Sequence, residues 1–375
     1  MTEINLDKYL ASTKPGQTHK LKRAVYTTIG YGTYPDQKPL GEKWKPGSKV
    51  FGEPYGGTII KNIRPDSDGD CTTLRGSEGC LAKDLVIDCG EKPNNNKFKH
   101  NGIYFGKDSE VFNCTVENTY GNYKDKRESF GIVVCDESRQ LASGRIVNSK
   151  VTKIQGDYTS GIIGHFINQC HVERDYPVSD MTPIFMVAYN IGQTIGGMLF
   201  ESSCKNMNSA VYADTGESNG NIVQDNNFYN TRYGMRLNAQ TTLTPQAPTI
   251  IKNILFRGNI VILQGGGKII AGVELDHTTA DSQVRENIQN CISNICIQDN
   301  KFEVVRYGYD VSPPKYSYAM NCASFTPSAK RSLSLGISGI EWRQQKNIPA
   351  DFLYRNRQGN AEILTNYLIK WITKY

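Results

Sequence analysis

The feature that most constrains this chain is a repeat of roughly 24 residues in its middle part, a period typical of stacked architectures. Residues 198–214 and 222–238 align without a gap: MLFESSC leads to AVYAD in the first stretch, and IVQDNNF leads to GMRLN in the second. A unit this short cannot bury an apolar face alone, so it is stable only when stacked on its neighbours. Stacking places equivalent residues in columns, and the columns can be followed in the sequence.

The repeat continues in both directions. Related runs occur at residues 112–116, 147–151, 167–172, 256–261 and 297–302, and a second short run starting with glycine recurs at 102–105, 131–134, 161–164 and 272–275. These runs alternate apolar and variable residues and favour β-branched types, which is typical of strands, and Asn and Gly mark the turns. Because no regular series of hairpin turns accompanies them, the pattern predicts a coil of parallel strands and not an up-and-down barrel.

The amino-terminal part adds a family likeness. The runs IGYGTYP at 29–35, KPGSKVFGEP at 45–54 and GTII at 57–60 resemble the first strands of the pectate-lyase-like (pectin-lyase fold) superfamily, although Tyr31 stands where that pattern has proline. The resemblance covers roughly residues 25–325 and implies an all-β, right-handed parallel β-helix. It does not choose a reaction, because that superfamily includes lyases, hydrolases, epimerases, esterases and phage tail spikes.

We expect one solenoid domain at residues 25–325, with an amino-terminal cap at 1–24 and a carboxy-terminal strand and helix segment at 326–375. A β-helix has open ends that expose its core and edge strands, and a terminal segment usually covers them. Residues 5–10 are expected to do this at one end. At the other end, a strand over 336–342 and a short capping helix starting after Asn360 are expected, because apolar residues recur at helical spacing. The apolar positions of that helix are Ile363, Leu364, Tyr367, Leu368, Trp371 and Ile372.

Composition excludes several classes. The net charge of +6 is mild and scattered, and no basic run with interleaved aromatics occurs, so nucleic acid is not an expected partner. No apolar stretch approaches the roughly 18 residues of a membrane span. We expect no signal peptide in this chain, because no positive, apolar, small-residue leader comes before the repeat. We expect a polysaccharide or oligosaccharide partner, a secreted, periplasmic or virion-surface location, and a homo-oligomer such as a trimer as one assembly.

The 10 cysteines show no zinc-type pairing. Cys71, Cys80 and Cys89 cluster, and disulfides among them remain open. Cys114 and Cys170 are expected to be buried, since free cysteine packs well in a core. They occupy a slot that later units fill with Asn226, Asn259 and Asn300. Buried amides must be hydrogen-bonded, so these three asparagines are expected to stack on one another at one internal turn.

The candidate site comes from the columns. Side chains alternate along a strand, so if the residues after the glycines point inward, the residues that follow them point outward. The inward set is Ile103, Ile132, Ile162, Val211, Met235 and Val273. The first outward column is then Tyr104, Val133, Ile163, Phe185, Tyr212, Arg236 and Glu274. The second is Gly106, Cys135, His165, Val187, Asp214, Asn238 and Asp276.

The early part of both columns is apolar and the later part is ionisable. We therefore expect Arg236, Asp214, Glu274 and Asp276 to be catalytic. The expected substrate-binding residues are Tyr212, His165, Asn238 and His277. Insertions at 239–249 and 278–290 follow two of these strands and would wall the site. The competing interpretation is a ladder of solvated ion pairs, each worth under about 1 kcal/mol.

Three chemistries compete. Elimination on a uronic-acid polymer is slightly favoured: the resemblance implies an Arg or Lys base in several such lyases, Arg236 lies among carboxylates, and Asp214, Glu274 and Asp276 could bind Ca²⁺ if the reaction depends on it. Glycoside hydrolysis by paired carboxylates is the first alternative, although the polygalacturonase-type motifs are missing and GHF at 164–166 departs from their "G-H-G". A non-catalytic glycan-binding or tail-spike domain is the second. Apart from calcium, no cofactor is expected.

Overall fold

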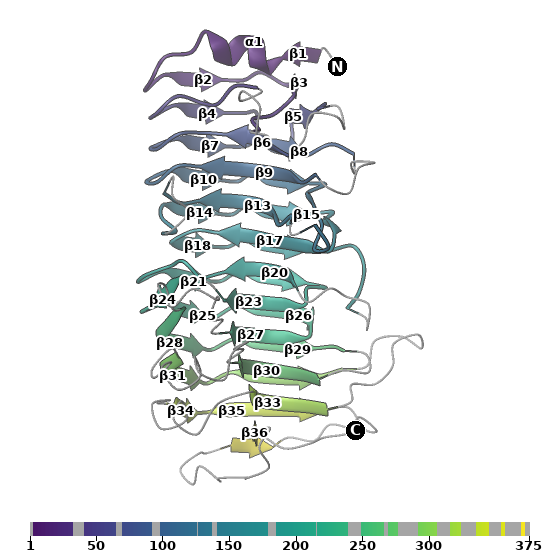
Figure 1. The fold of residues 1–375 in the computed structure, drawn as a ribbon, viewed down its shortest axis with the longest axis vertical. Coiled ribbons are helices and arrows are strands. Elements are labelled where there is room, and N and C mark those ends of the chain that lie inside the picture. The colour runs from purple at the N-terminus through teal and green to yellow at the C-terminus, as the bar shows by residue number, and fades with distance from the viewer. Residues whose placement is uncertain are drawn as a thin grey trace. The chain divides into compact units, whose positions relative to one another are not determined.

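The computed structural model describes residues 3–32, 41–64, 70–91, 98–125, 127–136, 141–178, 185–214, 216–238, 249–265, 269–276, 292–305, 316–323, 335–344, 354–356 and 369–371. The chain divides into two compact units, each described here by itself. Unit 1 holds residues 1–175 and 183–186, and unit 2 holds residues 176–182 and 187–375. Each unit is built from three parallel sheets whose strands follow one another in sequence order, coil after coil (Figure 1).

In unit 1, the first sheet contains β1 (Glu3–Asn5), β3 (Ala24–Thr28), β5 (Thr58–Asn62), β8 (Val86–Asp88), β11 (Thr115–Glu117), β15 (Lys150–Thr152) and β19 (His171–Glu173). The second contains β2 (Thr18–Lys20), β4 (Lys49–Phe51), β7 (Leu81–Lys83), β10 (Glu110–Phe112), β14 (Arg145–Val147) and β18 (Phe166–Asn168). The third contains β6 (Cys71–Arg75), β9 (His100–Phe105), β13 (Ser129–Val134) and β17 (Tyr158–Ile163), with the short strands β12 (Tyr120–Gly121) and β16 (Gln155–Gly156) beside them.

In unit 2, the first sheet contains β22 (Ser203–Lys205), β26 (Asn227–Thr231), β29 (Ile260–Leu263), β32 (Lys301–Val304), β35 (Ile340–Gln344) and β37 (Ile369–Trp371). The second contains β21 (Met198–Phe200), β25 (Ile222–Gln224), β28 (Ile250–Arg257), β31 (Ile292–Gln298) and β34 (Leu335–Ser338), and β24 (Glu217–Asn219) pairs with β28. The third contains β20 (Phe185–Asn190, from Val187 onward), β23 (Ser209–Ala213), β27 (Tyr233–Asn238), β30 (Ile269–Asp276), β33 (Tyr316–Ala323) and β36 (Tyr354–Asn356).

The first expected end segment contains a helix. Helix α1 (Leu6–Ala11) begins at Asn5, whose side chain accepts the Lys8 N–H at 2.9 Å, and it buries Leu6 and Leu10. In the carboxy-terminal segment, the single strand expected over 336–342 is present as two strands, β34 and β35. The chain turns between them at Gly339, whose φ is 63°. The domain boundaries at residues 24 and 325 stay predictions.

The prediction of a helix near the carboxy terminus is wrong for the three residues of it that the structure describes. Ile369–Trp371 form β37, which pairs in parallel with β35. The rest of that expected helix, including Asn360, lies outside the described residues. Alternating apolar residues serve a strand that joins a sheet edge as well as they serve a helix face, so periodicity over a short run did not separate the two.

The asparagine ladder is confirmed. Asn226 donates its side-chain N–H to Asn259 Oδ1 at 2.9 Å, and Asn259 donates to Asn300 Oδ1 at 2.9 Å. The same oxygens accept backbone N–H groups of Asn226 and Asn259 at 3.1 and 2.9 Å. In unit 1 the slot holds Cys114, with Ser149 Oγ accepting its N–H at 3.2 Å. The ladder therefore satisfies the turn backbone that each coil would otherwise bury unpaired.

Stacked rings fill the core of unit 2. Phe256 lies between Phe228 and Phe302, with 6.5 Å between ring centres on each side. Tyr189 and Trp342 continue the stack at 6.3 Å. The three phenylalanines come from successive coils, on β26, β28 and β32, so their stacking adds side-chain contacts between coils to the backbone pairing.

The described cysteines are free thiols, including Cys71, Cys80 and Cys89. Burial raises the pKa of Cys71 and Cys80 to about 11, and that of Cys114 and Cys170 to about 12. A thiol in this setting is a packing residue rather than a nucleophile, because the thiolate is the reactive form.

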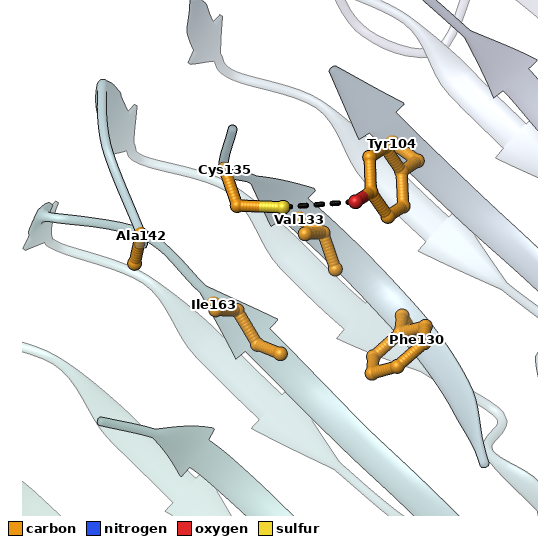
Figure 2. Close-up of a cluster of buried hydrophobic side chains, with 6 residues drawn as sticks. All are labelled: Tyr104, Phe130, Val133, Cys135, Ala142 and Ile163. Carbon is orange, nitrogen blue, oxygen red and sulfur yellow. Dashed lines mark hydrogen bonds between the residues drawn. The ribbon is translucent and has the colours of Figure 1, made fainter. Parts of the chain in front are cut away.

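The apolar outward column of unit 1 belongs to a cluster of buried side chains (Figure 2). Tyr104, Val133 and Ile163 are in register on β9, β13 and β17, as expected, but all three are buried. The Tyr104 hydroxyl and Cys135 Sγ lie 2.9 Å apart. These outward-pointing residues therefore form an apolar cluster of their own, so an outward direction along the strand does not mean exposure to solvent.

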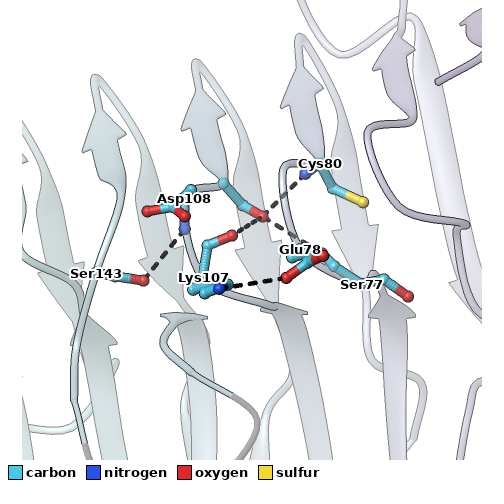
Figure 3. Close-up of polar contacts among 7 residues, drawn as sticks. Ser77, Glu78, Cys80, Lys107, Asp108 and Ser143 are labelled. Carbon is cyan, nitrogen blue, oxygen red and sulfur yellow. Dashed lines mark hydrogen bonds and ion pairs between the residues drawn. The ribbon is translucent and has the colours of Figure 1, made fainter.

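Polar contacts join the turns of successive coils in unit 1 (Figure 3). Ser109 Oγ accepts the Cys80 N–H at 2.9 Å, and Ser143 Oγ accepts the Asp108 N–H at 3.3 Å. The Lys107–Glu78 pair, 3.7 Å apart, is exposed and contributes under about 1 kcal/mol. Among the described helices, none is long and apolar enough to cross a membrane.

The ladder gives a stability prediction. Replacing Asn259 with Ala leaves two buried donors of Asn226 without their acceptor, so we expect the free energy of unfolding to fall by about 2–4 kcal/mol. Chemical denaturation measures it. Asn253→Gly is the control, because Asn253 has an exposed side-chain bond and a φ of 56° that suits glycine. Equal stability of the two variants would contradict the role of the ladder.

The buried thiols give a pH prediction. Their pKa values are raised in the folded state, so their contribution is complete below the unfolded value of roughly 8.5 and is lost as the pH rises toward the folded value. We expect stability to decline from about pH 9 upward. The stability of the Cys114→Ser variant should decline less steeply with pH, because the variant lacks one of these thiols. Serine fits the position, since Ser149 occupies the equivalent slot of the next coil. Rapid reaction of native Cys114 with a thiol reagent at pH 8 would contradict this account.

Candidate functional site

Three adjacent strands of unit 2 bring the expected site residues together. Tyr212 on β23 pairs with Arg236 on β27, and Arg236 pairs with Glu274 on β30. In the second column Asn238 pairs with Asp276, and Asp214 directly follows the last residue of β23. These are the columns expected from the sequence, because Val211, Met235 and Val273 are in register and fully buried.

Arg236 is at the centre of the group. Its Nε donates to Glu274 Oε1 at 2.8 Å, and its second terminal nitrogen lies 3.6 Å from Asp276 Oδ2. The guanidinium carbon is 5.9 Å from the Tyr212 ring centre and 5.3 Å from that of Tyr233, close enough for cation–π attraction. One cation therefore holds two carboxylates and contacts two rings.

The group is buried, and the expectation of a solvent-facing patch is wrong in this respect. The side chains of Arg236, Glu274 and Asp276 are 13%, 6% and 15% exposed, and Tyr212 is 3% exposed. A buried ion pair costs desolvation and is strongly destabilised when one partner is removed. The alternative of a solvated ion-pair ladder does not describe these residues.

Arg236 stays protonated and positively charged. Burial by itself lowers the pKa of Arg236, but Glu274, followed by Tyr212, Tyr233 and Asp276, acts in the opposite direction and raises it overall. A base must give up its proton readily. This environment holds the proton more firmly, so it opposes the base role expected for Arg236.

Tyr212 keeps its proton for a different reason. Burial raises the pKa of its phenol, and the Asp214 carboxylate raises it further, while Arg236 and the Asn238 amide act in the opposite direction. Asp214 and Asn238 thus lie close to the phenol, but its Oη makes no hydrogen bond of standard geometry with the part of the chain that is described.

One carboxylate oxygen of the group lacks a partner. Asp276 Oδ1 is buried and has no hydrogen-bond partner among the described residues. Most buried polar atoms in proteins are paired, and an exception calls for an explanation such as a bound ligand or water. This oxygen lies in the same group of three strands as the Tyr212 phenol.

Two neighbours of the group were not predicted from the sequence. The Tyr233 ring centre lies 5.3 Å from the Arg236 guanidinium carbon, and burial, followed by Glu274, raises the pKa of its phenol. Strict alternation from the buried Met235 would turn Tyr233 inward, so the periodicity gave no signal for this contact. The other is Asn190, which pairs with Tyr212.

The columns were misplaced at β20. Phe185 was expected beside Tyr212 and Val187 beside Asp214, but Val187 pairs with Ser209. The register is therefore shifted in this coil. Its preceding segment does not follow the repeat, so the sequence offered no marker for the shift.

The remaining expected residues are placed as follows. His165 follows β17 in unit 1, and His277 lies outside the described residues. Of the two insertions, Thr249 is described, and its hydroxyl donates to the Asp214 carbonyl oxygen at 3.1 Å. Within the described ranges, no three His, Cys, Asp or Glu side chains are grouped as metal ligands; Glu274 and Asp276 are instead paired with Arg236.

Comparison with known proteins places the fold. No family model and no curated protein matches the chain. Among solved structures, a mutant tailspike protein of the E. coli bacteriophage HK620, in complex with a hexasaccharide, is similar with a TM-score of 0.54 at 12% identity, over 97% of this chain and 59% of that one. A second HK620 tailspike mutant gives a TM-score of 0.52 at 11% identity, over 97% and 62%.

This chain thus spans about three fifths of the length of those tailspike chains. With three parallel sheets built coil by coil, the likeness confirms the fold class: the chain is a right-handed parallel β-helix.

The burial of Arg236 gives a prediction. Arg236→Met removes the partner of a buried Glu274 while keeping the size of the side chain, so we expect a loss of about 3–5 kcal/mol in the free energy of unfolding. The control is Arg145→Met, since the Arg145–Glu110 pair is largely exposed and 3.6 Å apart. Equal melting temperatures for the two variants would mean that Glu274 does not depend on Arg236.

Proposed function

We propose that this protein is an enzyme that binds and cleaves a polysaccharide at the group formed by Tyr212, Asp214, Arg236, Glu274 and Asp276. The observation that carries the proposal is the buried Asp276 Oδ1, which has no hydrogen-bond partner among the described residues, in one three-strand group with the buried Tyr212 phenol and a charge-paired arginine. A phenol that donates and a carboxylate that accepts suit the hydroxyl groups of a sugar, and the two tyrosine rings offer apolar faces.

The polysaccharide class is further supported by the fold neighbour, which was solved with a hexasaccharide bound. Its identity to this chain is low, so the neighbour supports the class of ligand and no particular glycan. A rigid sheet that carries the site on three adjacent strands is well suited to a polymer, because each added coil extends the same surface.

Hydrolysis is now favoured over elimination. Elimination needs a base, and the pKa of Arg236, its expected base, is raised. Hydrolysis needs one carboxyl group that donates a proton to the leaving oxygen and one carboxylate that removes a proton from water. Asp214 and Asp276 are two strand intervals apart in the second column, which is about 9.6 Å between backbones and near the upper end of inverting spacing.

In this scheme the other residues position the reaction. Arg236 stays charged, holds Glu274 and orients Asp276 through its second nitrogen. Tyr212 stays protonated and donates to a sugar oxygen near Asp214. Elimination remains the alternative. It retains the proposed Ca²⁺ at Asp214, Glu274 and Asp276, which would have to displace Arg236 from two of the three carboxylates.

Partners and location follow from the substrate. A protein that cleaves a polysaccharide meets it outside a cell, so we propose a secreted, periplasmic or virion-surface location, and a homotrimer as the assembly. The neighbour is a phage tailspike protein, which agrees with a virion surface. Size-exclusion chromatography with light scattering tests the assembly, and a monomeric mass would contradict the proposed trimer.

The test of the function is a panel of bacterial and plant polysaccharides, followed for new reducing ends and for the ultraviolet absorbance of unsaturated uronates. We expect reducing ends without absorbance, unchanged by EDTA. Asp214→Asn and Asp276→Asn should each lower kcat by about a hundredfold or more, as expected when an acid or base is removed. Asp225→Asn, at a turn of the same unit with φ 55°, is the control and should keep full activity.

Two outcomes would contradict this proposal. New absorbance that EDTA abolishes would replace hydrolysis with calcium-dependent elimination. Full activity in both the Asp214 and the Asp276 variants would show that these residues do not form the active site.

A further inference from the structure

The balance of charge in the site bears on the kind of sugar that it accepts, an inference that rests on the proposed function. Three carboxyl groups, those of Asp214, Glu274 and Asp276, share the site with a single guanidinium, that of Arg236. Two negative charges remain against one positive charge even when hydrolysis keeps one carboxyl group protonated. Burial weakens the screening of these charges by water and salt. The described part of the site is therefore negative, although the whole chain carries a net charge of +6.

The one cation in the group is already occupied. Arg236 directs Nε to Glu274 at 2.8 Å and a terminal nitrogen to Asp276 at 3.6 Å, and the rings of Tyr212 and Tyr233 lie within 6 Å of its guanidinium carbon. A carboxylate on a substrate would have to compete with these partners. It would also approach Asp214 and Asp276, at least one of which carries the same negative charge.

A second described arginine, Arg232, does not change this balance at the reacting end of the strands. Arg232 lies four residues before Arg236, about 13 Å along an extended strand, and it is buried. It acts on Tyr233, whose pKa it lowers against the larger effect of burial. It is therefore beside the start of β27, while Asp214, Asn238 and Asp276 are at the ends of their strands.

The unsatisfied atoms agree with this assignment. Asp276 Oδ1 accepts a hydrogen bond and cannot donate one while it is ionised. Its natural partner is a donor, such as a sugar hydroxyl, an N-acetyl N–H or an ammonium group. A uronate carboxylate offers only acceptors. We infer that the sugar bound between Tyr212 and Asp276 carries no carboxylate, so that the substrate is a neutral or amino-sugar polymer at this position.

The experiment compares sugars that differ in the carboxylate alone. The probes are oligomers of galacturonate and of mannuronate, and the galactose and mannose oligomers made from them by carboxyl reduction, together with neutral and amino-sugar oligosaccharides. Binding is measured by calorimetry at 50 and 500 mM salt. We expect every carboxyl-reduced or neutral ligand that binds to do so at least tenfold more tightly than its uronate counterpart.

The salt series and one variant identify the cause. The affinity of neutral ligands should change little with salt, whereas that of uronates should rise as repulsion is screened. Asp276→Asn removes one negative charge and should reduce the preference severalfold. Asp225→Asn, which has the same change of charge away from the site, should leave the preference unchanged, and melting temperatures verify that both variants fold.

The failures can be told apart. Tighter binding of uronate oligomers than of their reduced forms would overturn the inference and leave a polysaccharide-binding protein in place. Failure of every uronate, neutral and amino-sugar probe to bind would overturn the proposed function, and the inference with it.

Discussion

Parallel backbone pairing between successive coils is the constraint on which the rest of this structure depends. In unit 2 it sets Tyr212 beside Arg236 and Arg236 beside Glu274, and it does so through main-chain hydrogen bonds that need no particular side chain. A slip of one residue would turn each side chain of the strand to the other face. The pairing thus determines which side chains share the site before any of them interacts.

The core of the same unit protects that register. Asn226, Asn259 and Asn300 hydrogen-bond one another at the turns, and the rings of Phe228, Phe256 and Phe302 stack in the core with 6.5 Å between centres. Both arrangements link successive coils and would be broken by a slip. The coil can therefore support a group on its outer face that is costly in itself. That group contains a buried guanidinium with two carboxylates, a buried phenol and a carboxylate oxygen that has no donor among the described residues.

The coil fold and the residues that make up each outward column could be predicted from the sequence, because both depend on local periodicity. Gly234 before Met235, and Gly272 before Val273, mark the inward residue of each coil, so Arg236 and Glu274 could be placed as neighbours. Burial could not be predicted, because it depends on what covers the sheet, and alternation separates the two faces without distinguishing a covered face from a solvated one. The register of Asn190 was lost with the repeat, and the strand at Ile369–Trp371 was mistaken for a helix because a short apolar run fits both periods.

The central claim is that the register creates one ligand site between Tyr212 and Asp276, and a crystal structure of the protein with a bound oligosaccharide tests it most directly. The account predicts one sugar ring within hydrogen-bonding distance of both Tyr212 Oη and Asp276 Oδ1, with Arg236 still paired to Glu274. A sugar bound at another surface, with these two oxygens satisfied by the protein's own groups, would contradict it.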